Sequence, residues 1–84
     1  MNSEEFWDIV HNRIHEEVFT RECRIFIRAK KKYMKDMTNK ENRIDMKLKY
    51  PCVLGELKMF ASMRVISMPE LAEMRDFLED LPDE

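Results

Sequence analysis

From Ser3 to Tyr50, this chain is not interrupted by any glycine or proline. These two residues most often end regular elements, so a segment that lacks both can continue as helix over a long distance. The whole 84-residue sequence has one glycine and three prolines, and it is rich in residues that favour helix. We therefore expect an all-α protein that folds as one small helical domain over residues 1–84.

The spacing of apolar residues predicts a long N-terminal amphipathic helix from about Ser3, its expected N-cap, to Met37. At about 100° per residue, one side of this helix collects Trp7, Val10, Ile14, Val18, Ile25, Ala29 and Tyr33. The helix would be roughly 50 Å long. An 84-residue monomer cannot cover such a helix, so the pattern predicts a dimer or another partner. The alternative is a break near Thr20, where a second helix would begin.

Two patterns compete between Thr38 and Tyr50. Thr38 and Glu41 have the spacing of a capping box, which predicts a short helix that ends before Pro51. In RIDMKLKY, residues 43–50, apolar and charged residues alternate, which is typical of a half-buried strand. A strand there would pair with residues 24–28 or 63–67. The sequence leaves helix and strand open for residues 43–50, so a small α+β domain is the alternative fold.

Two shorter helices are predicted after Pro51. In the first, apolar residues from Val53 to Val65 recur at spacings of three and four. The second begins with a capping box, Ser67 and Glu70, and has Pro69 in its first turn. Together with the N-terminal helix they give the expected core: Trp7, Val10, Ile14, Val18, Ile25, Leu54, Leu57, Phe60, Val65, Leu71, Met74, Phe77 and Leu78.

Charge divides the sequence into three segments. Residues 1–20 have a net charge of −4, residues 21–49 of +7 and residues 50–84 of −5. The basic segment includes the stretch RAKKKYMKDM at residues 28–37. A surface of this kind favours docking on acidic protein, either the acidic ends of the same chain or a partner. The predicted basic patch consists of Arg24, Arg28, Lys31, Lys32, Lys35 and Arg43.

The favoured function is that of a small regulatory protein, without catalytic activity, that binds another protein or a second copy of itself through helix faces. An accessory or phage-type modulator has a composition of this kind. Aromatic residues dominate the energetics of interfaces. The predicted protein-binding anchors are therefore Phe6, Trp7, Phe19, Phe26 and Phe60.

Two other functions use the basic segment. A nucleic-acid-binding regulator would neutralise phosphates with residues 21–49, although a sequence pI near 5.7 is atypical of that class. Binding to a membrane surface through RIFIRAKKKYMKDM is the third reading, and the acidic segments on both sides oppose it. The sequence does not identify the partner, the oligomer number or the direction of regulation.

The sequence contains no catalytic or cofactor motif, so we expect neither an enzyme nor a bound cofactor. His11 and His15 have the spacing to share a helix face, and Asp8 falls beside them, but the sequence supplies no clear set of three or four ligands, so we expect no metal site. Cys23 and Cys52 lie far apart and are expected to be reduced thiols. An acidic N-terminus and the lack of a long apolar run favour a cytoplasmic location.

Overall fold

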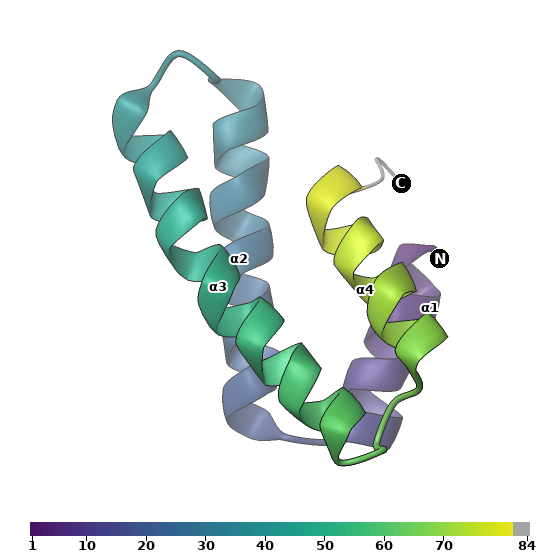
Figure 1. Cartoon of the computed structure of the whole chain (residues 1–84). Helices are drawn as coiled ribbons and strands as arrows, with labels where there is room; N and C mark the ends of the chain where they lie inside the picture. Colours follow the sequence, from purple (N-terminus) through teal and green to yellow (C-terminus); the bar gives the residue numbers. More distant parts are fainter. Residues whose placement is uncertain (82–84) are drawn as a thin grey trace.

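The computed structural model describes residues 1–81, and all regular structure in that range is helical (Figure 1). Helix α1 (Ser3–Asp8) continues directly into a π-helical segment, η1 (Ile9–Ile14). Three longer helices follow, which are α2 (Glu17–Lys35), α3 (Lys40–Ser62) and α4 (Met68–Asp80). The predicted all-α fold is confirmed. The strand alternative is wrong, because residues 43–50 lie within α3.

Helices α2 and α3 pack side by side as an antiparallel hairpin, which is the longest part of the molecule (Figure 1). The described chain measures 39 × 24 × 20 Å along its principal axes. Figure 1 shows α1 and α4 together on one side of the hairpin, near the end where α2 begins and α3 finishes. The opposite end, with the turn between α2 and α3, projects beyond them.

The predicted long N-terminal helix is broken at His15 and Glu16. His15 adopts a left-handed conformation, with φ 50° and ψ 51°. Glu16 is the N-cap of α2, and its carboxylate accepts hydrogen bonds from the backbone N–H groups of Val18 and Phe19, at 3.1 and 2.6 Å. The predicted break near Thr20 is also misplaced, since Thr20 lies inside α2. The reasoning that an overlong first helix requires a partner therefore fails.

The break brings two differently oriented apolar stripes into one core. Before it, the buried residues are Phe6, Ile9, Val10 and Ile14, and after it they are Phe19, Cys23, Phe26 and Ile27. In one straight helix these two sets would point about 130° apart. Because the chain turns at His15, both sets face inward.

Most of the expected core is buried, including Phe60 and Phe77, but the aromatic residues that pack against these two, Phe19 and Phe6, were missed. Phe6 of α1 stacks on Phe77 of α4, with ring centroids 4.5 Å apart. Phe19 of α2 meets Phe60 of α3 edge to face at 5.1 Å. Of the expected residues, Val18 is exposed, and five are half-buried: Trp7, Ile25, Leu54, Val65 and Leu71. The buried residues absent from the expectation are Phe6, Ile9, Phe19, Cys23, Phe26, Ile27, Ala29, Val53, Ile66 and Leu81.

Local capping signals differ in how well they place the helix ends. The capping box of Ser67 and Glu70 at the start of α4 is confirmed. At α1 the cap is Asn2 rather than Ser3. At α3 the cap is Asn39 rather than Thr38, and its side chain accepts a hydrogen bond from the backbone N–H of Asn42 at 3.2 Å. The helix expected to end before Pro51 instead continues through it to Ser62.

Arg13 connects η1 to the first turn of α4 and to the segment that precedes α4. Its guanidinium forms an ion pair with Glu70 and donates a second hydrogen bond to the carbonyl oxygen of Val65, at 3.0 Å. The hydrogen bond from Arg13, followed by that from the backbone of Ser67, lowers the pKa of Glu70 from 4.5 to about 2.

We expect Arg13→Met to lower the free energy of unfolding by about 1 kcal/mol at neutral pH, because a charge-assisted contact between two segments is lost. The folded-state pKa of Glu70 is depressed, so its stabilising contribution is complete above pH 4.5 and disappears as the pH falls to about 2. The difference in free energy of unfolding between parent and variant, measured by urea unfolding, should therefore shrink as the pH is lowered from 4.5 to about 2. A stability difference that is the same at both ends would contradict the assignment to the Glu70 carboxylate.

Candidate interaction surfaces

Most of the aromatic residues predicted as binding anchors belong to the core of this chain. Four of them are at most 7% exposed, which leaves no surface for a partner: Phe6, Phe19, Phe26 and Phe60. Trp7 is half-buried. Its ring stacks on that of His11, and the Arg24 guanidinium lies 5.8 Å from the ring centroid. In this fold Trp7 alone of the five is open to another protein.

The predicted basic patch forms a row along the solvent side of α2. Six Lys and Arg residues of this helix fall within about 100° of its circumference. All six are exposed, and we call them the basic ridge: Arg21, Arg24, Arg28, Lys31, Lys32 and Lys35. The ridge is about 21 Å long. Arg43, the remaining residue of the predicted patch, is exposed on α3.

Within the described part of the chain, no acidic residue forms an ion pair with the basic ridge. Across residues 1–81 the ion pairs are Arg13–Glu70, Lys49–Asp45 and Arg75–Asp76, and none involves the ridge. Charge is instead separated along the molecule. Residues 28–49, which include the turn end of the hairpin, have a net charge of +6, and the other residues of the range 1–81 have −6.

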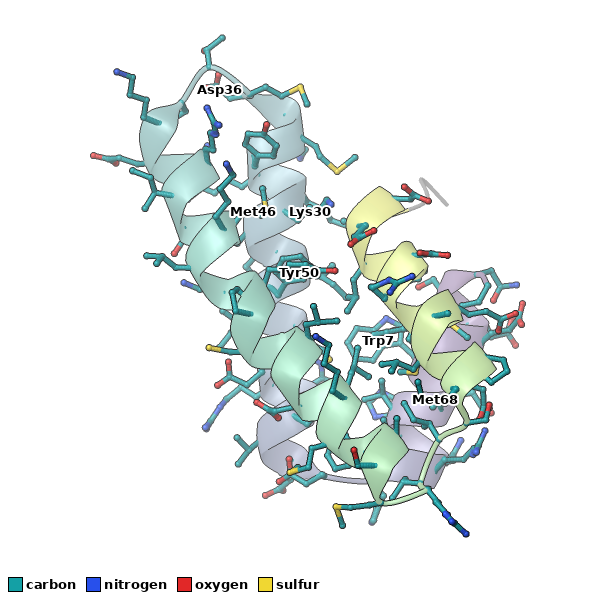
Figure 2. All side chains as sticks on the ribbon, viewed as in Figure 1. Trp7, Lys30, Asp36, Met46, Tyr50 and Met68 are labelled. Carbon is teal, nitrogen blue, oxygen red and sulfur yellow. The ribbon has the colours of Figure 1, made fainter. Side chains whose placement is uncertain are left out.

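Glu79 makes the contact through which the acidic end of α4 meets the hairpin. Its carboxylate accepts a hydrogen bond from the Tyr50 hydroxyl at 2.8 Å, and its carbonyl oxygen accepts one from Lys30. Figure 2 shows Tyr50 and Lys30 on the side of the hairpin that faces α4. Burial, then the bond to Glu79, raises the pKa of Tyr50, and burial lowers the pKa of Lys30. This junction uses a different side of α2 from the basic ridge.

Helix α3 has a second apolar face that the described chain leaves uncovered. Its inward face buries Val53, Leu57 and Phe60. Its outward face, extended by the C-cap Met63, has six exposed residues that are apolar or glycine within about 100° of the circumference, and Glu41 and Ser62 lie in the same arc. We call the six the apolar stripe: Ile44, Leu48, Cys52, Gly55, Met59 and Met63. The stripe is about 28 Å long. A helix that is apolar on opposite sides is typical of one that is covered on both.

The exposed fractions of the large stripe residues are high: Ile44 57%, Leu48 69%, Met59 49% and Met63 63%. Sequence reasoning missed this surface because the predicted helix boundary at Pro51 divides it. The signal was present in the spacing of residues 44, 48, 52, 55, 59 and 63, which keeps one helical phase across the proline.

The side chains that suggested metal or thiol chemistry are dispersed. His15 leaves the helical path, and its Nδ1 lies 3.0 Å from the carbonyl oxygen of His11. Within residues 1–81 no three His, Cys, Asp or Glu side chains are grouped to hold a metal ion. Both cysteines are free thiols, with Cys23 buried and Cys52 exposed. Over the same range, every helix is too short or too polar to span a membrane.

No protein-family model matches the chain, and comparisons with curated proteins and with solved structures find no significant match.

Proposed function

We propose that this chain is a binding protein without catalytic activity, and that its basic ridge docks on an acidic surface of another protein. The supporting observation is a row of six exposed cations on one helix face, none of which forms an ion pair with an acid of residues 1–81. Each exposed ion pair with a partner contributes only about 0–1 kcal/mol. A fixed row of them nevertheless determines orientation and partner choice.

Two methionines supply apolar contact next to the basic ridge. Met34 and Met37 are 44% and 63% exposed and lie at the end of α2 and in the turn that follows it. Methionine is flexible and polarizable, and it is common on surfaces that adapt to a partner. The surface therefore suits an acidic partner that also presents apolar side chains.

The acids around the basic ridge favour protein over nucleic acid as the partner. Glu17 falls on the same face of α2, one turn before Arg21. Outside residues 28–49 the range 1–81 has a net charge of −6. A nucleic-acid backbone is uniformly negative along its length and would meet this acidic region, whereas a protein can present a carboxylate patch as short as the ridge. Nucleic acid is the second candidate, favoured by the regular spacing of the ridge.

The experiment compares a ridge variant with the parent chain. In Arg28→Glu/Lys31→Glu/Lys32→Glu, three exposed cations of α2 are reversed. Binding to fluorescent poly-L-glutamate at low salt, measured by anisotropy, should weaken about 10–100-fold. A DNA duplex of similar charge is the parallel probe. Tighter binding to the duplex than to poly-L-glutamate would replace the proposed partner with the second candidate.

The control variant makes the same change in net charge away from the basic ridge. It is Lys58→Glu/Arg64→Glu/Arg75→Glu, at three exposed positions on α3, the following turn and α4. Its affinity for poly-L-glutamate should change by less than about threefold. Equal losses in both variants would show that total charge, and not the ridge, governs binding.

A further inference from the structure

We propose that the apolar stripe of α3 is the contact surface of a homodimer in which the α3 helices of two copies pack parallel to each other. The inference concerns a different face from the basic ridge and does not depend on it. In Figure 1, α1 and α4 lie to one side of α3, and no other element of residues 1–81 covers its outward face.

The shape of the stripe fits close contact between two helices. Small residues, Cys52 and Gly55, lie at its middle, and large apolar residues lie towards both ends. A Cβ at position 55 would meet nothing within 4 Å, so the fold of the monomer does not require glycine there. Glycine inside a helix costs about 1 kcal/mol relative to alanine. A second backbone passing close to Gly55 gives that glycine a structural role.

The period of the stripe suits a long, straight contact. Its residues follow one another at spacings of four, four, three, four and four, so Ile44 and Gly55 are eleven residues and three turns apart. Such a repeat drifts little around a straight α-helix. Two copies of α3 can therefore keep their stripes together over the full length without strong supercoiling.

Charge on the two flanks of the stripe selects a second copy and its orientation. One flank has Lys40, Lys47 and Lys58. The other has Glu56 and Asp45, with Lys49 beside Asp45 and paired to it, and keeps a net negative charge. In a parallel pair, the basic flank of each copy runs along the acidic flank of the other. In an antiparallel pair, basic flanks would face each other. The surface is thus complementary to itself in the parallel arrangement.

Glu56 illustrates what a second copy would supply. Burial first, and then the charges of Glu22 and Glu16, raise its pKa, so its own chain surrounds it with like charge. In the parallel pair, Lys58 of the second copy approaches this carboxylate. The contact face, about 28 by 10 Å from helix dimensions, is below the ~800 Å² per partner of a standard interface. We therefore expect a reversible dimer.

Sedimentation velocity from about 10 to about 500 µM tests association, since a weak dimer dissociates within this range. The mass of the parent should rise from 10.3 kDa towards twice that value. Leu48→Asp, in the stripe, should remain monomeric throughout. Met68→Asp is the matched control, because Met68 is 67% exposed but lies on α4 outside the stripe. A monomeric parent, or equal effects of the two substitutions, would overturn the proposal.

Orientation is tested by oxidation with diamide of the variant Met59→Cys/Cys52→Ser, which moves the exposed thiol away from the middle of the stripe. Two thiols form one disulfide and pass two electrons and two protons to the N=N bond of the reagent. The parallel pair places the two thiols at position 59 at the same level, whereas an antiparallel pair separates them by about 16 Å along the axis. Rapid dimer cross-linking is therefore expected, and adding Leu48→Asp should slow it about tenfold or more. If this variant is a dimer by sedimentation but does not cross-link faster than its Leu48→Asp form, the parallel arrangement is overturned.

Gly55→Lys separates folding from association. It places a large side chain where the second backbone would pass, and it should raise the free energy of unfolding of the monomer by about 0.5–1 kcal/mol. Loss of the dimer in this stabilised variant supports the stripe as the interface. Retention of the dimer would contradict it. The ridge variant Arg28→Glu/Lys31→Glu/Lys32→Glu should dimerise like the parent. The binding assay therefore tests the ridge proposal, and sedimentation tests the dimer proposal, each without the other.

Discussion

Replacing Phe19 by alanine should lower the free energy of unfolding by about 3–5 kcal/mol. Phe19 is fully buried, and it joins the first turn of α2 to the end of α3 through its edge-to-face contact with Phe60. Truncation would leave a cavity at the centre of the core. Domains of this size are stable by roughly 5–10 kcal/mol, so the variant should unfold at much lower urea concentration. Circular dichroism across a urea series measures the change.

The adjacent residue provides the control. Val18 is 48% exposed, and Val18→Ala should change the free energy of unfolding by less than about 0.5 kcal/mol. Comparison of Phe19→Ala with Val18→Ala distinguishes a core role for Phe19 from the role of a binding anchor. If Phe19→Ala kept the stability of the parent and only weakened association, the side chain would be a binding anchor and its burial in this fold would be incorrect.

The thiols of Cys52 and Cys23 should differ in reaction rate by about a thousandfold or more, because a reagent reaches Cys23 only when the fold opens locally. Cys23 is fully buried. Burial, followed by the nearby carboxylates of Glu56 and Glu22, raises the pKa of its thiol, which suppresses the reactive thiolate. Cys52 is exposed on α3. Treatment with a chromogenic disulfide reagent should therefore give a fast phase of one thiol and a very slow phase of the other.

Denaturation and substitution assign these two phases. In concentrated urea both thiols should react rapidly, and Cys52→Ser should remove only the fast phase. Two fast phases in the native protein would mean that the contact between α2 and α3 opens readily. That result would contradict the packing of Cys23 as described.

The parts of the fold that the sequence predicts well depend on local signals. The cap of α4 needs only Ser67, Glu70 and the proline between them, and all three act within one turn. The all-α class follows from composition and from the lack of helix-breaking residues. Neither inference requires knowledge of what packs against what.

The break at His15 was missed because its residues are unusual for the role. Glutamate is not among the preferred N-caps. The left-handed conformation is uncommon for any residue other than glycine, and histidine, although enriched in it, is not a strong signal for it. The available signal was the change of phase between Ile14 and Phe19, which a straight helix cannot bring to one side. The large aromatic residues marked that change more clearly than the smaller residues used to draw a single stripe.

The misleading strand pattern at residues 43–50 has a related cause. Ile44 and Leu48 form an outward pair four residues apart, while Met46 and Tyr50 form a half-buried pair with the same spacing. Because the two pairs are offset by two residues, apolar side chains occur at every second position of the sequence. A helix with apolar residues on both sides therefore imitates the period of a strand. The same feature is the basis of the dimer proposal.

The separation of charge between the projecting end of the hairpin and the remainder of the molecule gives the protein an electric dipole along its length. A charged partner approaching within a Debye length, about 8 Å at physiological ionic strength, would experience a torque before any contact forms. Encounters would then begin with the hairpin end already turned towards negative charge. The association rate constant would accordingly fall steeply with added salt, while the dissociation rate constant would change little.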